Sequence, residues 1–120
     1  MSLMKLFQEV FLDRHGYSTE EPEPTSKELR PFKFLIAKQG PSENKERNPT
    51  GVVIKDWTRS IGVNSVIKAE HDAEEAGLND VILVGNNFSL QARGMASRIS
   101  MRLVSRGELV VNYQPDPVVF

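Results

Sequence analysis

The stretch that decides the fold runs from Gly51 to Ser60 and reads GVVIKDWTRS. An uninterrupted apolar run opens it, which is typical of a strand buried on both faces in the middle of a sheet. Lys55, an aspartate and the chain's only tryptophan follow directly. Lys55 is therefore either a functional group presented at the end of a buried strand or a solvated strand end.

A second buried strand is expected downstream, where Asp80–Gly85 reads DVILVG between turn-forming residues. The segment between the two runs has helical periodicity, with a capping residue at or near Asn64 and a stop at Gly77. Its expected inner face consists of Val66, Ile67, Ala69, Ala73 and Ala76. A strand, a helix and a second strand in this order predict a right-handed parallel crossover.

A further crossover follows the second run. Ser89 is a suitable N-cap for another helix. The inner face of that helix would be formed by Ala92, Met95, Ala96 and Ile99. Residues 101–104 then predict a short last strand, and Ser105 to Glu108 have the spacing of a capping box, which predicts a helical turn.

The N-terminal half supplies the remaining elements. Helical spacing of apolar residues is found at Leu3, Leu6, Phe7, Val10 and Phe11. Gly16 would end this helix. Three prolines in residues 18–31 favour a loop or a ragged edge strand, residues 32–38 favour a strand, and residues 39–50 a loop. The order αβββαβ, followed by a further αβ, predicts a three-layer α/β sandwich with a central mixed sheet.

The overall composition suits one domain. The 120 residues are 39% hydrophobic and 26% charged, which is an ordinary balance for a globular protein. We expect a single domain over residues 4–113, a loose tail over residues 114–120 and a non-native prefix at residues 1–3. Because the chain has no cysteine, no signal-peptide pattern and no apolar run near the roughly 20 residues of a membrane span, a cytoplasmic protein without a membrane partner is expected.

The net charge of −1 gives no overall attraction to nucleic acid, but it is unevenly distributed. Residues 27–55 contain seven basic and three acidic side chains and end at Lys55, so this segment carries a net charge of +4. Such a segment is either a solvated surface or part of a contact for an anionic partner.

Common catalytic and cofactor motifs are missing from the sequence. It has no GxxxxGK[ST] phosphate loop, no GxGxxG and no HExxH. The two histidines are far apart in the sequence. His15, next to Gly16, is most simply a favourable charge at the end of the first helix, and His71 is most simply a surface residue. No cofactor is therefore expected from motifs alone.

Segments spread over most of the chain form a pattern. They are an amphipathic first helix followed by His-Gly-Tyr17, VVIKDW with Trp57, Gly62-Val63-Asn64 at a helix start, Asp80-VILVGN, Phe88-Ser89 with Ala92, and LVSRGEL. From Lys5 to Glu108 the chain thereby resembles the Mrr-type branch of the restriction-endonuclease-like, or PD-(D/E)XK, nucleases. The resemblance implies the αβββαβ core of that fold and binding to DNA.

The resemblance also implies a metal site. In that family an aspartate on the second strand, and a Glu or Gln two residues before a lysine on the third, hold Mg²⁺, and the lysine helps to orient or activate water. By position, Lys33 stands in place of the aspartate and Val53 in place of the Glu or Gln. Neither can ligate magnesium, so the standard site is missing and Lys55 is interpreted as its remaining group.

Relocated carboxylates could restore such a site. The candidates are Glu9 on the first helix, Asp56 beside Lys55 and Glu70 on the helix after Gly62. Strand alternation argues against Asp56, because its side chain should point away from that of Lys55. Glu70 lies at the border of the buried helix face and is the stronger candidate, as a catalytic group or metal ligand. Otherwise it is a solvated acid or an ion-pair partner of Lys55.

Contacts to nucleic acid are expected near the same strand end. Arg59 and Ser60, with Asn64 at the helix start, could bind a phosphate through backbone N–H groups and a guanidinium. Lys33 is a further candidate contact. Trp57 is interpreted as a core residue at the strand end, with stacking on a partner as the alternative.

Three functions are compatible with this pattern. We expect a nuclease-fold module that binds DNA or another partner, as a homodimer, without a cofactor and without cleaving. The first alternative is an active Mg²⁺-dependent endodeoxyribonuclease with relocated carboxylates, and the second is a protein–protein assembly domain. Salt-dependent DNA binding would distinguish the expected function from the second alternative.

Overall fold

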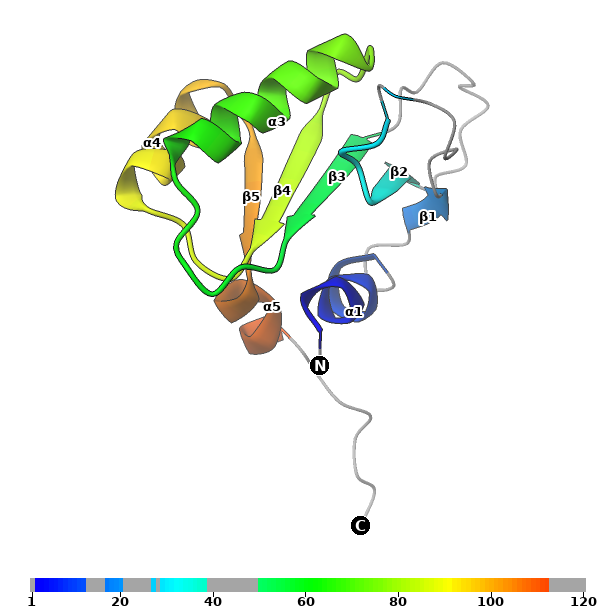
Figure 1. The fold of residues 1–120 in the computed structure, drawn as a ribbon. Helices are drawn as coiled ribbons and strands as arrows, with labels where there is room; N and C mark the ends of the chain where they lie inside the picture. Colours follow the sequence, from blue (N-terminus) through cyan, green and yellow to red (C-terminus); the bar gives the residue numbers. More distant parts are fainter. Residues whose placement is uncertain (1, 13–16, 21–26, 28, 39–49, 113–120) are drawn as a thin grey trace.

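One five-stranded mixed sheet lies at the centre of the molecule, in the order β1-β2-β3-β4-β5 (Figure 1). The computed structural model describes residues 2–12, 17–20, 27, 29–38 and 50–112. The strands are β1 (Tyr17–Glu20), β2 (Phe34–Lys38), β3 (Thr50–Lys55), β4 (Val81–Gly85) and β5 (Arg102–Ser105). Pairing is antiparallel from β1 to β3 and parallel from β3 to β5.

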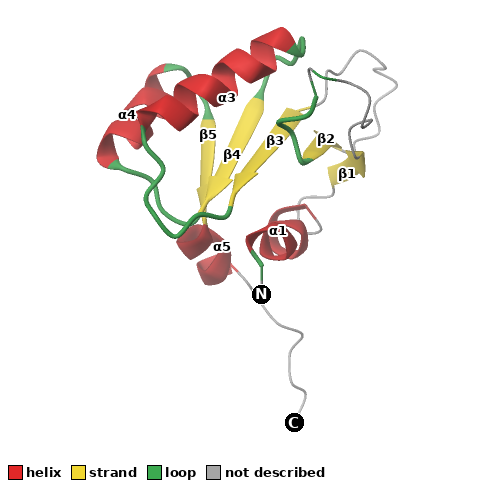
Figure 2. Ribbon diagram, in the orientation of Figure 1, coloured by secondary structure: helices red, strands yellow, loops and turns green. Residues whose placement is uncertain are grey.

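Helices pack on both faces of this sheet (Figure 2). One face carries α1 (Leu3–Phe7), its continuation as the π-helix η1 (Gln8–Leu12), and α5 (Arg106–Asn112). The other face carries α3 (Val63–Glu75) and α4 (Leu90–Arg98). The predicted α/β fold, its mixed sheet and its order of elements are therefore confirmed.

β3 joins the antiparallel and parallel halves of the sheet. It pairs with β2 through Phe34 and Val52, and with β4 through Lys55 and Gly85. The residues Gly51 to Val53 are buried, as the apolar run predicted. The strand ends at Lys55, so the following aspartate and tryptophan lie beyond it rather than within it.

The sheet separates two hydrophobic cores, because neighbouring residues of a strand point to opposite faces. Val52 and Val84 belong to the core beneath α1 and α5. Val53 and Leu83 belong to the core beneath α3 and α4. Each face of the central strands is thus covered, which explains why these strands are apolar without alternation.

α3 begins directly after Gly62, as predicted, but Asn64 is not its capping residue. Its N-cap is Gly62, in extended conformation and without a side-chain hydrogen bond, rather than Asn64. An isolated bridge between Ile61 and Phe88 holds the extended backbone immediately before the helix. Asn64 therefore falls in the first helical turn, where its side chain is exposed.

The inner face of α3 is narrower than predicted. Val66, Ala69 and Ala73 are buried, but Ile67 is 46% exposed. Each residue of a helix is rotated by about 100° from its neighbour, so when Val66 faces the sheet, Ile67 lies on the flank of the helix and is partly exposed to solvent. The assignment of Ile67 to the buried face was wrong.

The ends of α3 and α4 have the same geometry. Gly77, the predicted stop of α3, has a φ of +71°, and Leu78 N–H donates to the carbonyl of Ala73 at 2.8 Å. At the end of α4, Ser100 has a φ of +57°, and Met101 N–H donates to the carbonyl of Ala96 at 2.8 Å. This left-handed closing turn satisfies carbonyl groups that the helix leaves without a partner.

Ser2 and Leu3, which the sequence analysis set aside, take part in the first helix. Ser2 Oγ accepts a hydrogen bond from the Lys5 N–H at 3.2 Å, and Leu3 is fully buried. β1 covers the beginning of the segment predicted as a loop or a ragged edge strand, and Thr50, the last residue of the predicted loop over residues 39–50, begins β3. The predicted stop at Gly16, residues 39–49 and the tail over residues 114–120 lie outside the described residues. No helix among the described residues is long and apolar enough to span a membrane.

Candidate functional site

The carboxyl ends of the parallel strands lie together at one edge of the sheet, beside α5 (Figure 1). The strands β3, β4 and β5 end in register at Lys55, Gly85 and Ser105. The residues that follow them directly are Asp56, Asn86 and Arg106. Ligands of open α/β sheets commonly bind at this edge, so its side chains are candidates for a functional site.

Asp56, Asn86 and Arg106 form a hydrogen-bonded network, referred to below as the edge network. Asn86 Nδ2 donates to Asp56 Oδ1 at 2.9 Å and to the carbonyl oxygen of Trp57 at 2.7 Å. Arg106 Nε donates to Asn86 Oδ1, and Arg106 Nη2 lies 3.5 Å from Asp56 Oδ1. The Leu3 N–H donates to Asp56 Oδ2 at 3.4 Å. The edge network thus joins the ends of β3 and β4 to the beginnings of α1 and α5.

The environment of Asp56 favours its charged form. The hydrogen bond from Asn86 is the main cause that lowers the pKa of Asp56 below its ordinary value of 3.8. Partial desolvation opposes this shift, whereas the Leu3 N–H and the nearby Arg106 guanidinium reinforce it. The carboxylate is therefore held by donors from three elements and serves the structure of this edge.

Lys55 lies beside Trp57 rather than in the edge network. Its Nζ is 5.0 Å from the centroid of the Trp57 ring, and Cζ of Arg59 is 4.6 Å from the same centroid. Both distances are within the roughly 6 Å range of cation–π attraction. Trp57 is half-buried and packs against the core beneath α3 and α4. We refer to Lys55, Trp57 and Arg59 as the cation–aromatic cluster.

An open hollow of about 320 Å³ adjoins the cation–aromatic cluster at the start of α3. Its lining residues are Trp57, Arg59, Ser60, Gly62, Val63, Asn64 and Ser65. The structure thus brings together three of the four residues predicted to contact nucleic acid. The fourth, Lys33, is exposed immediately before β2, where its N–H donates to the Val52 carbonyl, and it does not line the hollow.

The backbone beside the hollow is fixed by contacts with the segment that precedes α4. Ile61 N–H donates to the Asn87 carbonyl at 2.9 Å, and Ser89 N–H donates to the Ile61 carbonyl at 3.0 Å. The Ile61 side chain also packs closely over Gly85, where an added Cβ would lie 2.1 Å from Ile61 Cδ1. A glycine at the end of β4 is therefore what allows this segment to approach the sheet.

The beginning of α3 is suited to an anion. Its first turn contains no acidic residue, and Gly62 provides no side-chain acceptor for the first N–H groups. These groups carry the positive end of the helix dipole. Together with the Arg59 guanidinium, they give the hollow a positive character.

The candidate carboxylates lie elsewhere. Glu70 lines a pocket with Asp80, Val81 and Met101, at the amino ends of β4 and β5, whereas Lys55 lies at the carboxyl end of β3. Glu9 is in η1, which packs on the opposite face of the sheet from the cation–aromatic cluster. The structure does not bring either acid to Lys55.

The position that holds a metal ligand in the resembled family is apolar and covered here. Val53 is 4% exposed and belongs to the core beneath α3 and α4. Within the described part of the chain, the metal-binding geometry that is found groups His71, Asp72 and Glu75 on α3, away from Lys55. The geometry around Lys55 therefore suits contact with an anion better than coordination of magnesium.

Comparison with protein-family models, with curated proteins and with solved structures gives no significant match to this chain. The resemblance to Mrr-type nucleases therefore stays a prediction that rests on the sequence segments quoted above.

The edge network was not predicted, although the sequence contains a signal for it. Asp56 and Asn86 directly follow two predicted buried strands, and Arg106 follows the last one closely. Because parallel strands end at the same edge of a sheet, side chains in these positions are expected to meet. The signal was that each of the three residues follows the carboxyl end of a predicted strand. It was not a motif within one segment.

Proposed function

We propose that this protein is a DNA-binding module of the restriction-endonuclease-like type, which binds the nucleic-acid backbone at the hollow and does not cleave it. The observation that carries the proposal is the cation–aromatic cluster, in which Lys55 and Arg59 both lie over the ring of Trp57. Cations held beside an aromatic ring are well placed to bind a polynucleotide backbone, because they attract its phosphates.

The chemistry of the hollow supports this assignment. Arg59 can approach a phosphate with two N–H groups at once, while the side chains of Ser60 and Asn64 offer further hydrogen bonds. The positive end of α3 faces the same hollow. Such contacts position a backbone and carry no sequence information, so we expect binding with little sequence preference.

The arrangement of the chain also supports a relation to the restriction-endonuclease-like fold. An initial helix precedes three antiparallel strands, and a helix then leads to a parallel fourth strand. This is the αβββαβ order that the resemblance implies. With Lys33 and Val53 at the ligand positions, we expect no magnesium cofactor.

Fluorescence anisotropy with a labelled DNA duplex tests the proposal. We expect binding that weakens steeply with added salt, and Lys55→Ala and Arg59→Ala should each lower the affinity several-fold and reduce the slope of log K against log salt by about 1. Arg98→Ala is the matched control, since Arg98 is an exposed arginine at the end of α4 and does not line the hollow.

Equal effects of Arg59→Ala and Arg98→Ala, or no salt-dependent binding, would contradict the proposal. A protein–protein assembly domain would then be the better explanation. The predicted homodimer is a separate prediction, which neither result tests. Sedimentation of the protein without DNA measures that property separately.

A cleavage assay with Mg²⁺ separates the proposal from the nuclease alternative. We expect no metal-dependent cleavage of supercoiled plasmid by the purified protein. Cleavage that is abolished by Lys55→Ala and retained by Arg98→Ala would replace the proposed function with that of an active endonuclease.

A further inference from the structure

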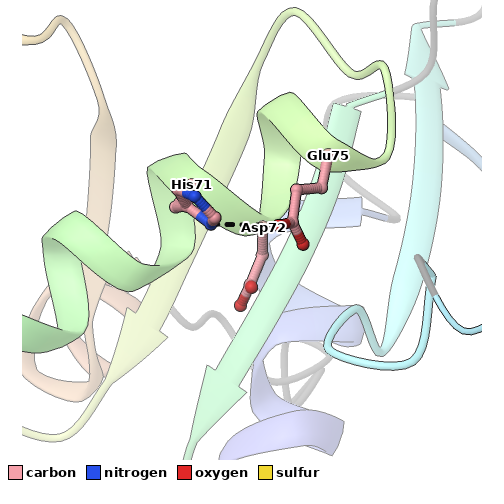
Figure 3. A group of neighbouring side chains, drawn as sticks. All are labelled: His71, Asp72 and Glu75. Carbon is pink, nitrogen blue, oxygen red and sulfur yellow. Dashed lines mark ion pairs between the residues drawn. The ribbon is translucent and has the colours of Figure 1, made fainter.

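A separate cluster of candidate metal ligands lies on α3. It consists of His71, Asp72 and Glu75, which Figure 3 shows as sticks on the helix. One ligand atom from each residue lies within 4.8 Å of those of the other two. His71 Nδ1 and Glu75 Oε1 are only 3.5 Å apart. We refer to these three residues as the α3 triad.

The helix itself brings these side chains together. Glu75 follows His71 by four positions and Asp72 by three, and these are the spacings at which side chains of one helix meet. Burial of Ala69 and Ala73 fixes how α3 sits on the sheet. As a result, the His71 and Glu75 side chains are 66% and 61% exposed, whereas that of Asp72 is only 14% exposed.

The α3 triad is distinct from the hollow. Ser65 is the last residue of the helix that lines the hollow, and Asp72 lies seven positions further along α3. At 1.5 Å per residue, this places the triad about 10 Å further along the helix axis. A metal held by the triad would therefore be independent of the proposed DNA contact and of Lys55.

We propose that the α3 triad is a surface site for a borderline divalent transition metal, for which Zn²⁺ is the probe. One imidazole nitrogen and two carboxylate oxygens are a ligand set that zinc accepts at about 2.0 to 2.2 Å, with water in the remaining position. Two carboxylates balance the charge of the ion. The imidazole selects against Mg²⁺ and Ca²⁺, which prefer oxygen ligands alone.

Lys68 modulates this site. Its Nζ lies 3.3 Å from Asp72 Oδ2, in an ion pair between residues four positions apart on α3. Oδ1 of Asp72 remains on the same carboxylate to bind a metal, but the ammonium group repels a second cation nearby. Replacing Lys68 with a neutral residue should therefore strengthen metal binding.

Calorimetric titration of the full chain with zinc chloride, together with NMR of the histidine rings, tests the proposal. The chain has no cysteine and only one other histidine, so His15→Gln provides a background in which His71 is the sole imidazole. We expect saturable binding of one Zn²⁺ and a shift of the His71 ring signals. His71→Ala and Glu75→Gln should each lower the affinity at least about tenfold, and Lys68→Gln should raise it several-fold.

Glu74→Gln is the matched control, because it removes the same charge from the exposed neighbour of Glu75. This variant should keep most of the zinc affinity. The proposal is overturned by the absence of saturable binding below about 1 mM zinc, by equal losses in Glu74→Gln and Glu75→Gln, or by unchanged affinity in His71→Ala. Circular dichroism checks that each exposed substitution leaves the fold intact.

Discussion

Lys55 and Asp56 are neighbours in the sequence but belong to different parts of the molecule. Lys55 lies over the ring of Trp57 on the face covered by α3 and α4, whereas Asp56 joins Asn86 and Arg106. Successive side chains of an extended chain point to opposite sides, so adjacent residues can have separate roles. At the scale of the residue, Asp56 stabilises the sheet edge, whereas Lys55 belongs to the cation–aromatic cluster on which the proposed function rests.

Asp56→Asn is expected to reduce stability in a pH-dependent way. Because the pKa of Asp56 is lower in the folded protein than its ordinary value of 3.8, the charged carboxylate stabilises the fold above that pH. This contribution is lost as the pH falls through 3.8 toward the lower folded pKa. We expect the variant to be less stable by no more than about 1 kcal/mol at neutral pH, since the group is solvent-accessible.

Urea denaturation at several pH values measures this difference. The stability difference between wild type and Asp56→Asn should shrink as the solution is acidified. Asp80→Asn changes an exposed aspartate outside the edge network and should alter the free energy of unfolding little. A difference between wild type and Asp56→Asn that does not change with pH would show that the carboxylate charge is unimportant here.

The closing turns of α3 and α4 offer a comparison at the scale of the element. Both place one residue in the left-handed region, but α3 uses Gly77 and α4 uses Ser100. A residue with a Cβ is strained in this conformation by roughly 1 kcal/mol, while glycine is not. The same geometry is therefore more favourable in α3 than in α4.

Ser100→Gly is expected to raise the free energy of unfolding by about 0.5 to 1 kcal/mol, and Gly77→Ala to lower it by about 1 kcal/mol. Thermal unfolding followed by circular dichroism measures both. Gly94→Ala, in the exposed interior of α4 where an added Cβ meets no atom within 4 Å, should be stabilising instead. Destabilisation by Ser100→Gly would contradict the argument from strain.

How well each element could be predicted follows from the range of the interactions that determine it. The Ser89 cap and the Gly77 stop are local signals, and both were predicted correctly. The N-cap at Gly62 was not, because it depends on pairing of Ile61 with a segment 27 residues later. The edge network depends on three separate strand ends in the same way. Arg59, Ser60 and Asn64 were each predicted as contact residues, but only the folded structure shows that they line one hollow together with Trp57.

At the scale of the whole molecule, the core beneath α1 and α5 depends on helices from opposite ends of the chain. The core beneath α1 and α5 contains Leu3, Phe7 and Leu109 against the sheet residues Val52, Val84 and Val104. The N-terminal helical segment α1–η1 supplies most of the helix residues in this core, and its loss would expose this face of the sheet. Stability of the molecule should accordingly be sensitive to the first few residues.

Leu3→Ala is expected to destabilise the protein by about 2 to 5 kcal/mol, because Leu3 is fully buried and its removal leaves a cavity. Leu90→Ala is the matched control, since Leu90 is 84% exposed and should change stability by no more than about 0.5 kcal/mol. Chemical denaturation measures both variants. Similar stability of the two would mean that the first helix contributes little to folding.

The net charge of −1 limits how the proposed DNA contact can work. The molecule as a whole does not attract a polyanion, so attraction must come from the local arrangement at the carboxyl edge. We therefore expect weak binding that is lost at moderate salt, rather than the strong general affinity of a basic protein.

The bridge between Ile61 and Phe88 has a consequence for how a partner would meet the hollow. Two backbone hydrogen bonds hold the segment before α3 against the segment before α4. Association need not order this segment first, so it does not lose that conformational entropy on complex formation. The hollow would thus be preformed for the proposed contact, and the Ile61 and Ser89 amide protons beside it should exchange slowly with deuterium in the free protein.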